Sequence, residues 1–195
     1  INMGELDTAR QTLEKALLLE PAGTELLVMV ARLDHAVGDF AAAETGFRAP
    51  LASPASPNAR ASVWGALHVY YRVQGQTTAA FDALARRIEE AATYLPPIQL
   101  IALRLSDLEV YFETGRQAEV QAILDEYGSQ LQAPTNIIAL IAELQLALEN
   151  RDVPAAETKL AAVEWMIAAN QIEAFGNAAV SAGARLAGLK GQWER

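Results

Sequence analysis

The chain has 195 residues, of which 52% are hydrophobic, and its formal net charge is -9. This length and composition suit one ordered domain or one helical array, and the acidity opposes nonspecific attraction to nucleic acid or to anionic membranes. The absence of cysteine excludes disulfides, thiolate catalysis and cysteine-ligated metal sites.

Amphipathic periodicity predicts ten helices. Around the glycine at residue 75, apolar side chains recur four residues apart at Leu67 and Tyr71 before the glycine, and at Ala80 and Leu84 after it. In chain order the expected helices cover 5–19, 23–37, 40–50, 58–74, 77–94, 98–114, 117–131, 135–149, 153–169 and 171–189. We therefore expect an all-α protein.

Prolines support the breaks between these helices, because proline lacks an N–H and fixes φ. Pro21 and Pro96 fall between expected helices, and residues 49–57 hold three prolines in the most loop-like stretch of the chain. Pro154 follows Asp152, which we expect to be an N-cap, so this proline can occupy the first turn of its helix.

Six turn signals recur along the chain at separations of 34, 37, 40, 36 and 40 residues. They are centred on Gly4, Gly38, Gly75, Gly115, Arg151 and Gly191. A period in this range with a marked turn in each unit is typical of a helical solenoid, in which no unit buries its apolar face alone. Each unit is then an antiparallel pair of helices.

At this point the chain resembles the tetratricopeptide repeat (TPR) family. The third unit carries the fullest match, with Trp64, Leu67, Tyr71, Gly75, Ala80, Leu84 and Pro96 at the family spacing. Five turns are also followed by a mostly small residue and, four positions later, a large one: Ala9 and Leu13, Ala43 and Phe47, Ala80 and Leu84, Val120 and Leu124, Ala156 and Leu160. His68, Val120 and Arg151 depart from the family pattern, and other helix-pair solenoids with repeats near 40 residues are the structural alternative.

The resemblance implies a right-handed superhelical solenoid of antiparallel helix pairs. We expect residues 1–195 to be one segment of about five hairpins, with both ends cut within a repeat. The natural protein would then extend in both directions, or its ends would pack on a neighbour, which also allows a homo-oligomer. We favour the cytoplasm over the periplasm, and expect no membrane insertion because no apolar run reaches the roughly 18 residues that a span needs.

Catalytic patterns are missing from the sequence, so we expect no enzyme, no cofactor and no metal. There is no nucleophile elbow, phosphate-binding glycine loop or zinc pattern. We interpret His35 as a solvated helix-end residue and His68 as a satisfied core histidine in preference to a general base. The adjacent acids Glu89 and Glu90 point about 100° apart on a helix and are read as a solvated face.

The aromatic residues can also be interpreted as either structural or functional. Trp64, Tyr70 and Tyr71, with Phe81, could form a ligand-stacking wall, but their helical spacing favours hairpin core. The same interpretation places Trp165 in a core, and Trp193 in the final turn would lack a packing partner. We therefore expect these side chains to be structural first.

For binding, the resemblance implies a concave groove lined by the first helix of each hairpin. The groove positions are then Glu25, Val28, Arg32, His35, Ser62, Val69, Arg72, Leu105, Glu109, Ile138, Ile141, Gln145, Ser181 and Arg185. The guanidinium groups of Arg32, Arg72 and Arg185 would pair well with carboxylates. A peptide with an acidic segment or a free C-terminus is thus an expected ligand.

Internal pairing of these arginines is the alternative. Asp34, Glu109 and Glu143 are nearby acids that could neutralise them. Either way, the function expected is a non-catalytic scaffold for a protein or peptide partner. Two further readings stay open: an effector-sensing array of a larger signalling or transcription-regulatory protein, and the recognition arm of a multidomain enzyme.

Overall fold

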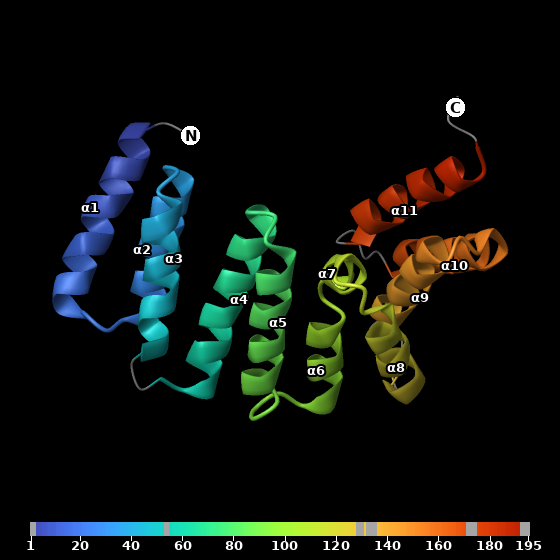
Figure 1. Ribbon diagram of the computed structural model, residues 1–195, viewed down its shortest axis with the longest axis horizontal. Coiled ribbons are helices and arrows are strands. Elements are labelled where there is room, and N and C mark those ends of the chain that lie inside the picture. Colours follow the sequence, from blue (N-terminus) through green and yellow to red (C-terminus); the bar gives the residue numbers. More distant parts are fainter. Residues whose placement is uncertain (1–2, 53–54, 128–130, 132–135, 171–174, 192–195) are drawn as a thin grey trace. The chain divides into compact units, whose positions relative to one another are not determined.

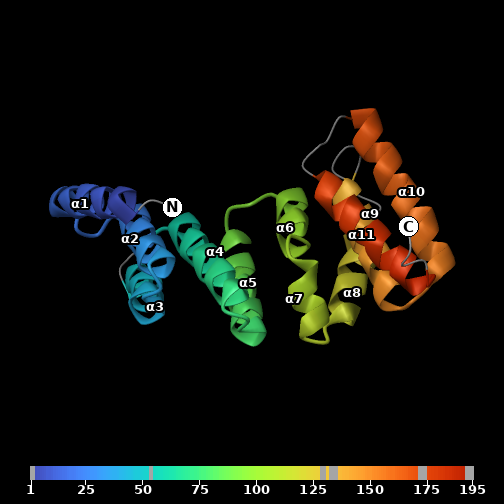
Figure 2. The same ribbon diagram turned by 90° about the horizontal axis from the view of Figure 1, so that it is seen from above.

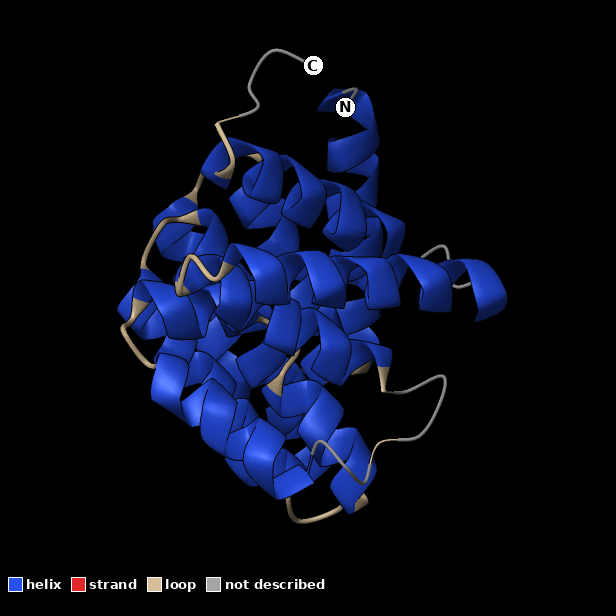
Figure 3. Cartoon of the chain, turned by 90° about the vertical axis from the view of Figure 1, so that its right-hand side faces the viewer, coloured by secondary structure: helices blue, strands red, loops and turns tan. Residues whose placement is uncertain are grey.

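The computed structural model describes residues 3–52, 55–127, 131, 136–170 and 175–191. Within these ranges the regular structure is entirely helical and contains no strand (Figures 1 and 3). The helices are α1 Met3–Leu19, α2 Thr24–Ala36, α3 Phe40–Arg48, the 3-10 helix η1 Ala49–Ala52, α4 Pro57–Val73, α5 Thr77–Ala91, α6 Pro97–Arg104, α7 Leu108–Glu113, α8 Gln117–Tyr127, α9 Ile137–Glu149, α10 Val153–Asn170 and α11 Gly176–Leu189. None of these helices combines the length and apolar character that crossing a bilayer requires.

The chain divides into two compact units, unit 1 over Ile1–Leu100 and unit 2 over Ile101–Arg195. In unit 1, α4 is the central helix and packs against α2, α3 and α5. In unit 2, α9 contacts α7, α8, α10 and α11 (Figure 2). Packed helix pairs are therefore confirmed, while one solenoid segment with both ends cut stays a prediction.

The predicted turns from residue 38 onward share one backbone design. Gly38, Gly75, Gly115 and Gly191 all have positive φ, between 68° and 86°. At each, the N–H donates to the carbonyl three residues back, as in a Schellman helix end. The second bond of that motif, from the following N–H to the carbonyl five residues back, joins Asp39 to Asp34, Gln76 to Tyr71, Arg116 to Tyr111 and Asp152 to Ala147. Gly4 differs, because it lies in the first turn of α1.

Arg151 makes the same turn without glycine. Its φ is 56°, and it is the one non-glycine residue with positive φ among the described residues. Its N–H donates to the Leu148 carbonyl at 3.2 Å, while the Asp152 carboxylate caps α10 through the N–H of Ala155 at 3.1 Å. The hydrogen bonds on both sides hold Arg151 in the left-handed conformation, which residues with a side chain disfavour.

Replacing Arg151 with glycine is expected to stabilise the protein. Relief of the left-handed backbone is worth roughly 1–2 kcal/mol, and the greater freedom of glycine in the unfolded chain offsets about half of it. The net gain of about 1 kcal/mol is measured by urea unfolding followed by circular dichroism. Gly75→Ala is the reciprocal variant and should lose a similar amount; a destabilised Arg151→Gly variant would contradict the strain argument.

One predicted helix is wrong, because the range 98–114 is two helices. α6 ends at Arg104, and Asp107 opens α7 by accepting the Val110 N–H at 3.3 Å. Ser106 and Asp107 form an N-cap signal that the continuous apolar periodicity concealed. The other predicted helices agree with the structure to within a few residues where both are described, and the predicted starts at 135 and 171 lie outside the described residues.

The alternation of small and large residues positions the helix pairs. Ala43, Ala80, Val120 and Ala156, four of the five small members, are 0% exposed, whereas Ala9 is half-buried. Small side chains there let paired helices approach closely. The large members differ: Phe47, Leu84 and Leu124 are buried, whereas Leu13 and Leu160 are half-buried.

The core of unit 2 forms around α9, which is apolar on nearly all sides, as expected of a helix with neighbours all round. The cluster comprises Leu144, Ala147, Leu148, Ala156, Val163, Ala179, Ala182 and Leu186. It joins α9, α10 and α11, and so holds one wall of the groove described below.

Trp165 is a correction to the sequence-based interpretation. It is 67% exposed on α10, so it is not a core residue. The buried positions of α10 are instead Ala156, Val163 and Met166. The prediction about Trp193 lies outside the described residues.

Arg60 and Glu90 link the open end of the α4–α5 hairpin. The guanidinium donates to both carboxylate oxygens, at 2.7 and 2.8 Å, and also to the Ala55 carbonyl at 2.6 Å. The hydrogen bond from Arg60 lowers the pKa of Glu90. Glu89 pairs separately with Arg86, so these adjacent acids form no dyad.

Candidate functional site

Unit 2 contains a pocket of about 460 Å³ bordered by α6, α7, α9 and the start of α11, which we call the unit-2 groove. Its lining residues are Ala102, Leu105, Ser106, Asp107, Leu108, Glu109, Ile138, Ile141, Gln145, Phe175 and Ala178. Seven of these are apolar, and the polar ones gather where α6 ends and α7 begins, apart from Gln145 on α9. The groove thus has an apolar wall and a polar edge.

The α6–α7 break builds that edge. Leu105 and Leu108, on either side of the break, are buried and fix it to the core. Asp107 is held in place by its bond to the Val110 N–H, and Glu109 is exposed one residue into α7. In one continuous helix Asp107 would not be an N-cap, and Asp107 and Glu109 would not both lie at this edge.

Arg185, on α11, is bound to the opposite wall. Its Nη1 donates to the Gln145 Oε1 at 2.6 Å, and its Nη2 donates to the Glu149 Oε1. Arg185 is therefore paired within the protein. Its partner, Glu149, lies 36 positions away and is not one of the acids expected from the sequence. Of the acids expected to pair with groove arginines, Asp34 binds Arg10 at 2.6 Å, and Glu143 binds Lys159.

A smaller hollow of about 210 Å³ lies between α2 and α4 in unit 1. Four projected groove residues line it, namely Glu25, Val28, Arg32 and Ser62, together with Thr24 and Met29. Arg32 is exposed and makes no ion pair with the described residues. The projection thus brings Val28 and Arg32 together as expected.

His35, Val69 and Arg72 line neither pocket. His35 is half-buried, not solvated: its ring lies 5.5 Å from Phe40 and 5.6 Å from Tyr70, and its Nε2 is 3.2 Å from the Gln74 side-chain nitrogen. Val69 is 59% exposed on α4. His35 is therefore a packing residue that joins the end of α2 to α4.

His68 is a satisfied core histidine, as predicted. It is buried, and its Nδ1 lies 2.9 Å from the carbonyl oxygen of Ala80. Because a carbonyl only accepts, Nδ1 carries the proton and donates. The bond fastens α4 to α5 and gives the ring a structural role.

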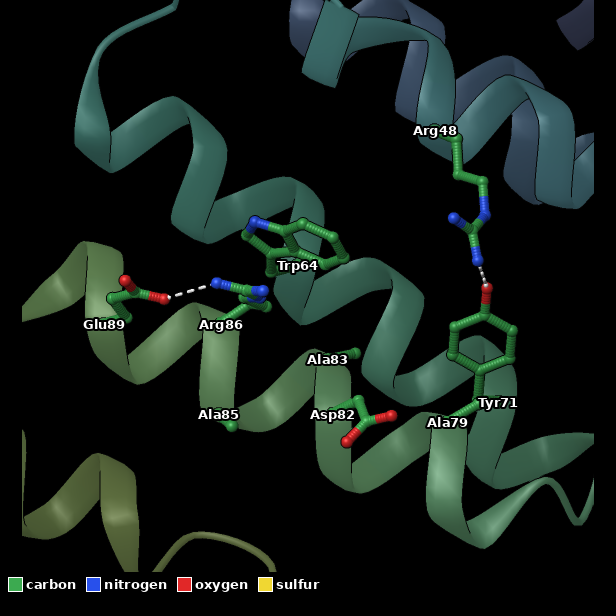
Figure 4. Close-up of a pocket in the computed structure, with 9 residues that line it drawn as sticks. All are labelled: Arg48, Trp64, Tyr71, Ala79, Asp82, Ala83, Ala85, Arg86 and Glu89. Carbon is green, nitrogen blue, oxygen red and sulfur yellow. Dashed lines mark hydrogen bonds and ion pairs between the residues drawn. The ribbon is translucent and has the colours of Figure 1, made fainter.

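A third pocket lies over α4 between α3 and α5 (Figure 4). Its volume is about 590 Å³, and its lining residues are Arg48, Trp64, Tyr71, Ala79, Asp82, Ala83, Ala85, Arg86 and Glu89. The interpretation of the aromatic residues as core is confirmed for Tyr70 and Tyr71, which are buried. Trp64 is half-buried and lines this pocket together with Tyr71.

A hydrogen-bond chain closes one side of that pocket. The Arg48 Nη2 donates to the Tyr71 hydroxyl at 2.6 Å, and the hydroxyl donates to the Glu44 Oε1 at 2.7 Å. Burial raises the pKa of Tyr71, and the bond to Glu44 acts in the same direction. Tyr71 therefore stays a neutral link between α3 and α4.

No constellation for metal binding occurs in the part of the chain that the structure describes: no three His, Asp or Glu side chains gather as ligands. Comparison with known proteins adds no relative, because no family model, no curated protein and no solved structure matches the chain. The candidate site is therefore argued from its own geometry.

Proposed function

We propose that this chain is a non-catalytic scaffold that holds a peptide segment of a protein partner in the unit-2 groove. The observation that carries the proposal is the convergence of five projected positions on one pocket, namely Leu105, Glu109, Ile138, Ile141 and Gln145. An apolar pocket with a few convergent polar groups is the usual form of a binding site. Peptide segments dock in such grooves through spaced apolar anchors.

Packing between alternate helices supports a tetratricopeptide-like arrangement as part of this proposal. Within unit 1, α2 packs on α4; within unit 2, α7 packs on α9 and α9 packs on α11. These are the first helices of successive hairpins, which line the concave face in that family. A right-handed superhelix of these pairs is the architecture we propose.

An effector-binding role is the second candidate. The pocket beside Trp64, at about 590 Å³, has the size of a small-molecule site and offers an indole face. It lies in unit 1 and is separate from the unit-2 groove, so both roles can be tested independently.

The scaffold proposal is tested by selecting binders to the whole chain from a random twelve-residue peptide display library. We expect enriched peptides whose affinity falls at least about tenfold in Ile141→Ala, as for an interface hot spot. Val180→Ala is the matched control, because Val180 is 74% exposed on α11 and does not line the groove. Failure to enrich any peptide, or peptides insensitive to Ile141→Ala, would remove the proposal.

A further inference from the structure

The pocket beside Trp64 combines an aromatic surface with charged side chains. Trp64 comes from α4, and Asp82, Arg86 and Glu89 come from α5 (Figure 4). Three alanines of α5 also line the pocket, and their small side chains add little bulk to that wall. Its volume of about 590 Å³ is in the range of sites that hold small organic molecules.

Three of the four charged side chains that line this pocket are paired within the protein. Arg86 donates to the Glu89 carboxylate at 2.9 Å. Arg48 donates to the Glu44 carboxylate at 3.1 Å. Each pair joins one cation to one anion, so neither pair gives the pocket an excess of charge.

Asp82 is the fourth charged side chain, and its charge is not balanced. It makes no hydrogen bond or ion pair with the residues that the structure describes. It is exposed in the second turn of α5, so its carboxylate is accessible to a ligand in the pocket. The unbalanced carboxylate favours a cationic ligand over an anionic one.

Trp64 suits the same class of ligand. Its side chain is half-buried, and it makes no ring contact or cation–π contact within the described part of the chain. Tryptophan is the aromatic side chain that attracts a cation over its face most strongly. The same ring buries the apolar part of a ligand, because it is large and hydrophobic.

We infer that the pocket beside Trp64 binds an organic ammonium ion, with the apolar body of the ligand against the indole and the ammonium group beside Asp82. This inference rests on the proposed effector-binding role and names the chemical class of the effector. A ligand carboxylate in the same position would be repelled by Asp82, so the pocket also discriminates against anions of the same shape.

The test uses three probes of similar size and different charge: phenylpropylammonium, the neutral phenylpropanol and the anion phenylpropionate. Each is titrated at neutral pH into the isotopically labelled chain, and the indole N–H signals are followed by NMR. The chain has three tryptophans, and a Trp64→Phe variant assigns the signal of Trp64. We expect the ammonium probe to shift this signal saturably and to bind at least about fivefold more tightly than the anion.

Two neutral variants separate local charge from overall charge. Asp82→Asn keeps the shape of the side chain and removes its charge, so the preference for the ammonium probe over the anion should fall to about twofold or less. Asp7→Asn is the matched control, because Asp7 is exposed on α1 and does not line the pocket. It changes the net charge equally and should keep the preference.

Two results would overturn the inference and leave the effector-binding role standing, because the Trp64 signal still shifts in both. The first is an anionic or neutral probe that binds as tightly as the ammonium probe. The second is an ammonium preference that is equal in the Asp82→Asn and Asp7→Asn variants. No shift of the Trp64 signal by any of the three probes would also overturn the inference. The peptide selection tests the scaffold function separately, through Ile141 in the unit-2 groove.

Discussion

Replacing Leu84 with alanine is expected to lower the free energy of unfolding by about 3 kcal/mol, within the range of fully buried leucines. Leu84 is 0% exposed on α5, and α5 packs on α4, the central helix of unit 1. The loss combines the transfer of the removed methyl groups with the cavity that they leave. Urea unfolding followed by the circular dichroism of the helices measures it.

Leu13→Ala is the matched control for that variant. Leu13 occupies the same place in the small-and-large pattern, but it is half-buried on α1, which packs on α2. We expect it to cost about 1 kcal/mol, since part of its surface is already in water. Equal losses for the two leucines would show that the pattern position, and not tertiary burial, sets the energy.

Replacing Gly46 with leucine is expected to cost about 2–3 kcal/mol or more, through overpacking between α2 and α3. A Cβ at Gly46 would lie 3.0 Å from the Cβ of Ala31 and 3.5 Å from its Cα. Ala31 is completely buried, so neither helix can yield without moving backbone. Thermal unfolding by calorimetry measures the loss.

Gly183→Ala is the contrasting substitution in a helix interior. Its Cβ would meet only the Cδ2 of Leu160, at an ordinary 3.7 Å. Alanine is favoured over glycine in a helix by roughly 1 kcal/mol, so this variant should be more stable than the parent. A Gly46→Leu protein as stable as the parent would contradict the close approach of α2 and α3.

These glycines illustrate how the two units are stabilised. Close helix approach depends on small residues at repeated positions. Each unit also has one central helix: α4 packs against α2, α3 and α5, and α9 packs against α7, α8, α10 and α11. The unit-2 groove borders the central helix of its unit. A ligand in the unit-2 groove would consequently contact residues next to the core cluster of α9, α10 and α11.

Local chemistry in the sequence determined the helix pairs and most of their turns. A left-handed residue, a Schellman bond and a cap involve only neighbouring backbone, so Gly38, Gly75 and Gly115 could be identified without any tertiary contact. At Asp107 two local signals competed. The continuous apolar periodicity masked the N-cap of α7, so the break between α6 and α7 was not predicted.

Tertiary packing decided which of the projected groove positions share the unit-2 groove. Arg185 and Glu149 are 36 positions apart and meet because α9 and α11 pack together. The exposure of Trp165 and the pocket beside Trp64 likewise depend on which helices flank α10 and α4, which spacing does not encode. Helical periodicity defines a face, but the angle and distance between helices determine whether that face meets a neighbour, a ligand or water.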